Sequence, residues 1–293
     1  MSATEKHSLR QEQASHPREF PNFTYAYPVL SRRAQGISIG VNLNIDKHCN
    51  FDCPYCQVDR TVSRPGQAID VDTVTYEVES LLAQTDKHGV CRLPKFASLP
   101  DDRKILKDVA ISGDGEPTMV PEFPEVCTRL AALQAARPDM EFNLILITNA
   151  SLLDRAGVQK GIASLLSRNG EVWAKLDAGT EAWYQKVNVS RISLDRIEEN
   201  LKLLGRSHPY RIQSMFCALD GDSPSAAEQN AFLERLQRIK AAGSRILDVQ
   251  LYTLARKSAQ ASCTPVTAAF LDILRLRIVS ETGLPARVYG LED

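Results

Sequence analysis

Three cysteines define the chemistry that this sequence could perform. Cys49, Cys53 and Cys56 are spaced as C-x3-C-x2-C within the segment CNFDCPYCQVDR. Thiolates this close together in one loop can converge on a soft metal centre, and three of them suit an iron-sulfur cube. The loop supplies no fourth thiolate, so one iron of such a cube would stay open. An open iron is a place where a substrate or a cofactor can bind.

Two simpler roles for these cysteines are disfavoured. A structural zinc site needs four protein ligands, and the nearby fourth candidate, His48, is adjacent to Cys49 and badly placed to reach the same ion. A disulfide framework is disfavoured because seven cysteines are an odd number and the other four are scattered singly through a long chain. Those four are Cys91, Cys127, Cys217 and Cys263.

The loop resembles that of the radical S-adenosylmethionine (radical SAM) superfamily, whose motif is C-x3-C-x-aromatic-C, with Tyr55 in the aromatic position. The resemblance implies that Cys49, Cys53 and Cys56 bind a [4Fe-4S] cluster whose open iron chelates S-adenosylmethionine. It further implies reductive cleavage of this cofactor to a 5'-deoxyadenosyl radical, which abstracts hydrogen from a substrate, and a reducing partner such as flavodoxin or ferredoxin. Tyr55 is then expected to shield the cluster and to bind near the adenine of the cofactor.

A glycine-rich segment, GDGEPTM, is the second motif. Glycines let the backbone approach a ligand closely, and carbonyl and carboxylate oxygens can accept hydrogen bonds from an amino group. A tight turn alone would also explain the glycines. After a predicted strand, however, the segment looks like the superfamily's Gly-Gly-Glu-Pro type segment, which contacts the amino group of the cofactor. The resemblance implies that the methionine end is held by Gly113, Gly115, Glu116 and Pro117.

Six strand-helix units are expected to position these motifs. Amphipathic and capped segments alternate with the predicted strands and predict helices, and parallel strands joined by right-handed helical crossovers form an α/β fold. Six units match the partial (β/α)6 TIM-type barrel of the radical SAM core, in which chemistry gathers in the loops after the strands. The strands are predicted at residues 36–45, 108–112, 142–147, 171–176, 210–219 and 245–254. The helices are predicted at residues 69–89, 124–137, 156–167, 193–204, 223–242 and 266–282.

Further candidates fall at the ends of these strands. Lys175 and Asp177 can point to one face of the fourth strand, and enclosed charges are costly unless they are paired or bind a ligand. They are therefore candidate catalytic residues, with an internal ion pair as the alternative. Asn149 could orient the cofactor or cap a turn. Gln250 lies on the strand whose end contacts adenine in the superfamily, and Arg256 just beyond could neutralise a carboxylate or lie in solvent.

Composition indicates a water-soluble globular protein. The 293 residues are 43% hydrophobic and 24% charged, and no apolar run approaches the ~20 residues that span a bilayer. The polar N-terminus lacks the apolar core of a signal peptide, and an oxygen-sensitive cluster with free cysteines predicts a cytoplasmic location. Residues 1–35 are expected to form an N-terminal arm and cover, and residues 36–293 the radical SAM core with a short C-terminal extension. A single cluster is expected.

The substrate is the part of the function that the sequence specifies least. GDGEPTMVPEF and LDAG resemble the radical SAM group that includes wyosine-type tRNA base-modifying enzymes, so tRNA is one hypothesis. The net charge of −1 gives no support for a phosphate-binding surface, and a small molecule, a peptide or activation of a glycyl-radical enzyme stays open. The alternative outside catalysis is a metal-binding regulatory module, which the glycine-rich segment and the ordered strand-helix units disfavour.

Overall fold

The computed structural model describes residues 20–31, 33–60, 68–86, 88–255, 258 and 260–289. Arg256, a candidate from the sequence, lies outside these residues. The chain divides into two compact units that interleave along the sequence. Unit 1 comprises residues 1–48, 64–147 and 156–171, and unit 2 comprises residues 49–63, 148–155 and 172–293.

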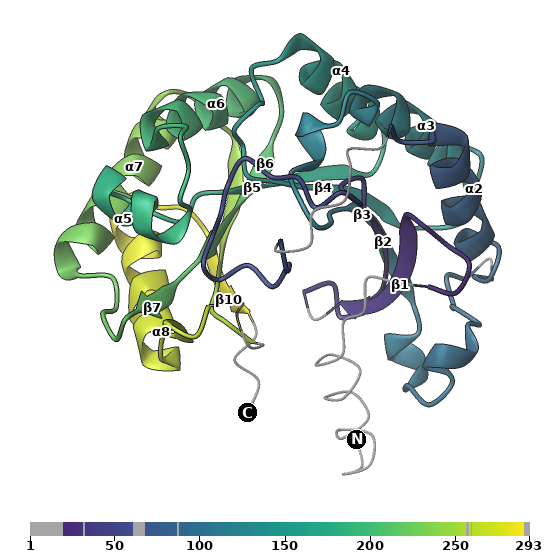
Figure 1. The fold of residues 1–293 in the computed structure, drawn as a ribbon, viewed down its shortest axis with the longest axis horizontal. Coiled ribbons are helices and arrows are strands. Elements are labelled where there is room, and N and C mark those ends of the chain that lie inside the picture. The colour runs from purple at the N-terminus through teal and green to yellow at the C-terminus, as the bar shows by residue number, and fades with distance from the viewer. Residues whose placement is uncertain are drawn as a thin grey trace. The chain divides into compact units, whose positions relative to one another are not determined.

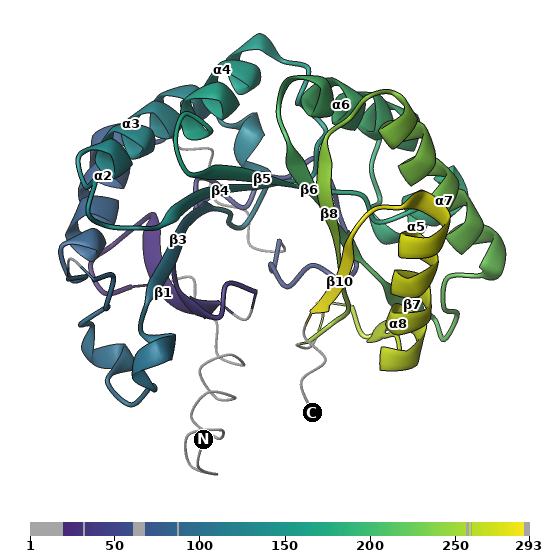
Figure 2. The same cartoon turned by 180° about the vertical axis from the view of Figure 1, so that it is seen from behind.

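Unit 1 is built on four strands in the order β1-β2-β3-β4 (Figure 1). β1 pairs antiparallel with β2, whereas β2, β3 and β4 are parallel to one another. Three helices lie together on one side of these strands, as both ribbon views show (Figures 1 and 2). The elements are β1 (Ala26–Ser31), β2 (Gly36–Val41), α2 (Val71–Leu82), β3 (Leu106–Ile111), α3 (Phe123–Ala135), β4 (Asn143–Thr148) and α4 (Ala156–Leu165).

Helix α2 shows how the sequence determines an element of unit 1. Asp70 accepts a hydrogen bond from the backbone N–H of Thr73 at 3.1 Å and so satisfies a free donor of the first turn. The apolar residues of the helix recur on one face, which is buried as the spacing predicts. The helix ends at Leu82, earlier than the predicted end at residue 89.

Residues 1–35, which were expected to form an arm and cover, contain strand β1. Glu77 of α2 is only 3% exposed, and its carboxylate accepts hydrogen bonds from the backbone N–H groups of Thr24, Tyr25 and Ala26 at 2.7, 2.7 and 2.8 Å. These bonds fix the point at which the strand begins. The predicted boundary at residue 35 between an arm and a core stays a prediction, but residues 26–31 belong to the sheet of unit 1.

Unit 2 contains parallel strands in the order β5-β6-β8-β10. Helices α6, α7 and α8 lie on one side of these strands (Figure 2), and a separate antiparallel pair is formed by β7 and β9. The elements are β5 (Gly170–Lys175), α5 (Glu181–Val187), α6 (Leu194–Ser207), β6 (Tyr210–Met215), β7 (Cys217–Leu219), α7 (Ala226–Ala241), β8 (Ile246–Tyr252), β9 (Cys263–Pro265), α8 (Ala268–Arg277) and β10 (Ala286–Tyr289).

The predicted α/β class with a parallel sheet is confirmed, with local differences in unit 2. The predicted strand 210–219 is interrupted at Phe216, because its end pairs with β9 in the separate two-stranded sheet. Helix α7 is capped by Ser225 and begins later than the sequence predicts, and α5 was not predicted. Within the described part of the chain, no helix combines the length and the apolar character needed to cross a membrane.

Candidate cofactor site

The cysteine loop belongs to unit 2 and is anchored to the residues that end helix α5. Phe51 bridges to Ser190 as an isolated antiparallel pair, and its ring lies edge-on to Tyr184 with centroids 5.8 Å apart. The backbone N–H of Asp52 donates to the carbonyl of Asn188 at 3.1 Å. These contacts hold the first half of the loop, which carries the cysteines, on a packed surface of the unit.

The three cysteines are half-buried and form no disulfide. The loop turns between the second and third of them, where the N–H of Cys56 donates to the carbonyl of Cys53 at 2.9 Å. Side-chain N–H groups contact both sulfurs: Asn188 Nδ2 lies 3.5 Å from Cys53 Sγ, and Arg60 Nη1 lies 3.3 Å from Cys56 Sγ. Donors of this kind favour a negatively charged sulfur over a neutral one.

Asn149, predicted to bind the cofactor, lies beside the first cysteine. Its Nδ2 donates to Asn50 Oδ1 at 2.7 Å and is 4.0 Å from Cys49 Sγ. Its Oδ1 accepts a hydrogen bond from the N–H of Ser151 at 3.0 Å. Asn149 therefore links the residue after Cys49 to the turn that follows β4, which is the capping role that the sequence left open.

Asp177 is the centre of a buried polar network in unit 2. Its Oδ2 accepts from the Tyr55 hydroxyl at 2.5 Å and from Asn188 Nδ2 at 2.9 Å. Its Oδ1 accepts from the backbone N–H of Met215 at 2.9 Å and lies 3.4 Å from Lys175 Nζ. Both oxygens thus have two partners each, so the carboxylate connects the cysteine loop to strands β5 and β6.

Lys175 and Gln250 lie at the same level of the sheet of unit 2. The strand register pairs Lys175 with Gln213, and Gln213 with Gln250, so the three side chains share one face. Gln213 Nε2 donates to Gln250 Oε1 at 3.2 Å. Lys175 Nζ donates to the Tyr252 hydroxyl at 2.7 Å. Its ammonium group also lies 5.1 Å from the centre of the Tyr55 ring.

Burial and the charge of Asp177 shift the pKa values of three residues of this network, and all three shifts are upward. Burial raises the pKa of the Cys53 thiol to about 12, and the Asp177 carboxylate adds to the rise. Burial by itself would lower the pKa of Lys175, but Asp177 and then Tyr252 outweigh it and raise that pKa. Burial, followed by the charge of Asp177, raises the pKa of Tyr55. Lys175 is therefore a cation at neutral pH, and Tyr55 is a hydrogen-bond donor.

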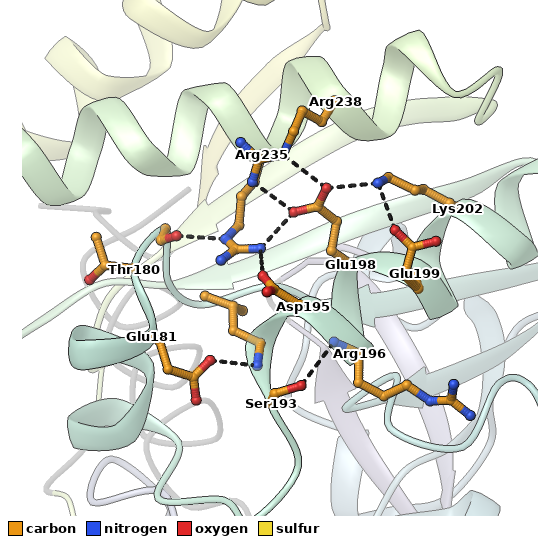
Figure 3. A network of polar contacts seen from close by, with 12 residues as sticks. Thr180, Glu181, Ser193, Asp195, Arg196, Glu198, Glu199, Lys202, Arg235 and Arg238 are labelled. Carbon is orange, nitrogen blue, oxygen red and sulfur yellow. Dashed lines mark hydrogen bonds and ion pairs between the residues drawn. The ribbon is translucent and has the colours of Figure 1, made fainter.

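The turn after Asp177 is fixed by helix α7. Gly179 N donates to Glu228 Oε1 at 2.5 Å, and its carbonyl accepts from Arg235 Nε at 2.5 Å. No side chain fits at this position, because a Cβ on Gly179 would lie 2.1 Å from the backbone nitrogen of Phe232. The network of Figure 3 continues from Arg235 to Glu198 on α6 at 2.6 Å. The polar contacts between α6 and α7 thus hold the segment that carries Asp177.

The glycine-rich segment belongs to unit 1 and is held by two asparagines that follow β2. Asn42 Oδ1 accepts from Asp114 N at 3.1 Å, and its Nδ2 donates to Asp114 Oδ2 at 2.9 Å. A Cβ on Gly113 would lie 2.2 Å from Asn42 Oδ1, so glycine is required there. Asn44 Nδ2 donates to the carbonyl of Glu116 at 3.2 Å. Asn44 Oδ1 is buried and has no hydrogen-bond partner among the described residues.

Gly115 and Glu116 place backbone close to the residue that precedes the cysteine loop in sequence. Glu116 N lies 3.4 Å from the carbonyl of His48, and a Cβ on Gly115 would lie 1.9 Å from the same oxygen. The Glu116 carboxylate accepts from the N–H and hydroxyl of Thr118, which caps the short 3-10 turn that begins at Pro117. At Gly115 and Glu116, the backbone of the glycine-rich segment therefore lies directly against the carbonyl of His48.

The predicted site residues thus fall into two groups. The sequence missed Asn42, Asn44, Arg60 and Asn188, which contact predicted residues but stand outside any motif. Unit 2 brings together Cys53, Tyr55, Lys175 and Asp177, while the ligand roles themselves stay predictions. Unit 2 contains Cys49, Cys53, Tyr55, Cys56, Asn149, Lys175, Asp177 and Gln250, and unit 1 contains Gly113, Gly115, Glu116 and Pro117.

The three free thiols of the loop are the donors that would hold an iron-sulfur cluster. Among the residues with described positions, no three or more Cys, His, Asp or Glu side chains are grouped closely enough to hold one metal ion. The ligands of structural zinc must all lie about 2.0–2.3 Å from one ion. Thiolates on a [4Fe-4S] cube bind different irons and can stand farther apart. For S-adenosylmethionine, the buried Asn44 Oδ1, which has no partner among the described residues, fits an acceptor for an amino group.

Comparison with known proteins assigns the class to which this fold and these residues belong. The family model described as Radical SAM superfamily matches residues 43–233, which include the cysteine loop and the glycine-rich segment. The chain belongs to the radical SAM superfamily. The predicted family and its α/β fold are thereby confirmed.

Two curated proteins are similar in sequence to part of this chain. A UPF0026 protein of Methanocaldococcus jannaschii is 27% identical to this chain. The aligned region covers 59% of this chain and 47% of the length of that protein. A UPF0026 protein of Helicobacter pylori (strain 26695) is 28% identical to this chain. The aligned region covers 46% of this chain and 37% of the length of that protein. The chain therefore spans less than half the length of the curated relatives it matches.

Two solved structures share the fold. A structure of TYW1 with a lysine-pyruvate adduct bound aligns with a TM-score of 0.56 and 11% identity over 96% of this chain and 90% of that one. Streptococcus suis SuiB bound to S-adenosylmethionine aligns with a TM-score of 0.54 and 12% identity over 83% of this chain and 44% of that one. At these identities the similarity shows the fold alone.

Proposed function

We propose that this protein binds one [4Fe-4S] cluster through Cys49, Cys53 and Cys56 and cleaves S-adenosylmethionine reductively to begin hydrogen abstraction. The observation that carries the proposal is the cysteine loop itself. Three free thiols follow the superfamily spacing, and the aromatic residue of the motif donates to Asp177 at 2.5 Å. The motif is thereby tied to a partly buried cation, Lys175, 3.4 Å from the same carboxylate.

The chain's own residues have distinct proposed tasks. Gly113, Gly115, Glu116 and Pro117, supported by Asn42 and Asn44, would hold the methionine end of the cofactor. Lys175 would offer positive charge to a carboxylate, and Asp177 would keep Tyr55 and Lys175 in place. Asn149 and Gln250 would line the ligand region of unit 2. When bound, the cluster and the cofactor would supply the 5'-deoxyadenosyl radical.

Anaerobic reconstitution tests the proposal directly. The protein is treated with iron and sulfide, and we expect about four irons per chain and formation of 5'-deoxyadenosine from S-adenosylmethionine with dithionite. Cys49→Ala, Cys53→Ala and Cys56→Ala should each abolish the product, whereas Cys127→Ala, in the core of α3, should retain it. A brown protein that forms no 5'-deoxyadenosine, or a colourless one that holds a single zinc, would overturn the proposal.

The physiological partners follow from the same chemistry. We propose a cytoplasmic location and electron delivery by a flavodoxin or a ferredoxin. The substrate is proposed from the classes already considered, namely a tRNA base, a small molecule, a peptide or a glycyl-radical enzyme. Incubation with deuterated candidates distinguishes them, because the true substrate transfers deuterium to 5'-deoxyadenosine. Candidates that fail to label it are excluded.

A further inference from the structure

Each cysteine of the loop has a side-chain N–H donor directed at its sulfur, and the three donors come from different parts of unit 2. Asn188 approaches Cys53 at 3.5 Å, Arg60 approaches Cys56 at 3.3 Å, and Asn149 approaches Cys49 at 4.0 Å. We infer that these donors set the reduction potential of the cluster, with Asn188 as the principal positioning residue. The inference rests on the proposed function.

Asn188 is built into the structure as a donor. The residue is 1% exposed, and its Nδ2 donates to Asp177 Oδ2 at 2.9 Å. A carboxylate cannot donate, so the amide nitrogen must face it, and this fixes which way the amide points. The amide oxygen has no partner among the described residues. All polar contacts described for this side chain are therefore made by its amide nitrogen, and one of them is with Cys53 Sγ.

The surroundings of Asn188 hold this geometry rigidly. Its carbonyl accepts the N–H of Asp52 at 3.1 Å, so its backbone and its side chain both contact the cysteine loop. Its Nδ2 is also 3.3 Å from the Tyr55 hydroxyl. Asn188 caps the C-terminal end of α5, so its backbone is positioned by a helix. A donor held in this way loses little conformational entropy when it binds a charged sulfur.

A donor to sulfur acts on the potential through charge. Reduction adds one negative charge to a cluster, and the sulfurs share that charge. An N–H group pointing at a sulfur favours the reduced form, which raises the potential. The effect is greatest for a donor away from solvent, because screening is weak there. Asn188 is buried, whereas Arg60 is half-buried and Asn149 is the most distant of the three donors, so Asn188 should contribute most.

The alternative is that Asn188 only holds the loop, and the potential distinguishes the two roles. We would replace it in Asn188→Leu, which keeps the branched shape and removes the donor. The reconstituted protein without S-adenosylmethionine is titrated electrochemically, and the reduced cluster is followed by electron paramagnetic resonance. We expect the ratio of reduced to oxidised cluster at a fixed potential to fall about tenfold, a shift of about 59 mV for one electron.

A matched control is Gln134→Leu, which removes a buried amide donor in unit 1. Gln134 Nε2 donates to the carbonyl of Phe142 at 2.7 Å, so this variant loses stability without losing a donor to sulfur. Its midpoint potential should equal that of the unmodified protein. A shift of the same size in Gln134→Leu would overturn the inference, because the shift would then report general destabilisation.

The remaining outcomes separate the inference from the proposed function. If Asn188→Leu holds a full cluster at an unchanged potential, the inference is wrong and the proposed function stands. If Asn188→Leu cannot hold a cluster, Arg60→Met decides, since a lower potential supports the role of the donors and an unchanged one overturns it. If the unmodified protein itself binds no cluster, the inference and the proposed function fall together.

Discussion

The hydroxyl of Tyr55 donates to Oδ2 of Asp177 at 2.5 Å, and this bond joins the cysteine loop to the end of strand β5. The two residues are far apart in sequence, yet each lies next to residues that have a role in the proposed function. Tyr55 lies between two of the cysteines, and Asp177 lies beside Lys175. The aromatic position of the cysteine motif thus has a structural role through its hydroxyl as well as through its ring.

Tyr55→Phe should loosen the loop without unfolding the protein. The substitution removes one donor to a charged group, so we expect a loss of about 1.5–3 kcal/mol in the free energy of unfolding. We also expect formation of 5'-deoxyadenosine to fall about tenfold, because the loop is less well positioned. Urea denaturation and product assay measure the two effects. Tyr76→Phe, at a site that is 67% exposed, should change neither, and an unchanged Tyr55→Phe would contradict the role of the hydroxyl.

Gly179→Ala should destabilise the turn after Asp177. The added Cβ would lie 2.1 Å from Phe232 N and 2.6 Å from the carbonyl oxygen of Glu228, so backbone must move. We expect a loss of about 1–3 kcal/mol, measured by urea denaturation. Gly157→Ala is the matched control, because its Cβ would be 3.6 Å from the nearest atom, in Pro124. On helix α4 that change should stabilise by about 0.5–1 kcal/mol. Equal stability of the two variants would contradict the predicted clash.

Asp108→Asn should change how stability depends on pH. Burial raises the pKa of Asp108 to about 6 from 3.8, although a hydrogen bond from Ser38 opposes the rise. The folded state therefore holds a proton that the unfolded state releases, and stability falls as pH rises between about 4 and 6. We expect Asp108→Asn to be more stable than the unmodified protein at pH 7, by up to about 3 kcal/mol, and equally stable near pH 3.5.

Ser38→Ala provides the opposite test of this carboxyl group. Loss of the Ser38 hydrogen bond should raise the pKa of Asp108 further and extend the loss of stability to higher pH. Thermal melts across pH 3.5–8 measure both variants. Parallel curves for Ser38→Ala, Asp108→Asn and the unmodified protein would show that Asp108 does not titrate in this range.

Glu77→Ala should release the start of strand β1. Three backbone N–H groups would lose the acceptor that they share, and those of Tyr25 and Ala26 lie in buried residues. We expect a cost of about 3–5 kcal/mol in the free energy of unfolding, because each orphaned donor costs roughly 1–3 kcal/mol and the effects overlap. Glu79→Ala removes an ion pair to Arg137 at 3.0 Å on the exposed side of the same helix. That loss should stay under about 1 kcal/mol, and a similar cost for both would refute the anchoring role of Glu77.

Local patterns in the sequence were sufficient to predict most elements. Ser193 caps α6 by accepting from Arg196 N at 3.3 Å, and apolar runs predict the parallel strands within a few residues. Strand β1 escaped prediction because its pairing with β2 and the role of Glu77 depend on contacts distant in sequence. Charged residues predict exposed positions, so nothing in the local pattern marks Glu77 as buried.

The residues of the candidate site could likewise be predicted only where they belong to a local sequence motif. The cysteine and glycine motifs are short, so the sequence predicts them directly, together with the strands that precede them. Asn188 belongs to no motif, and its contact with Cys53 depends on how the loop folds back onto the end of α5. A polar residue that ends a short helix is common in any protein, so its chemical role is visible only in three dimensions.

The interleaving of the two units has a consequence for the folding of the chain. The sequence passes from one unit to the other five times, at residues 48/49, 63/64, 147/148, 155/156 and 171/172. Unit 1 is complete only when the ribosome has synthesised residue 171, and by then two segments of unit 2 have also been synthesised. Cys49, Cys53 and Cys56 are among these early residues. The three thiols are therefore made well before residues 172–293, the segment that supplies Asp177 and Asn188 beside them.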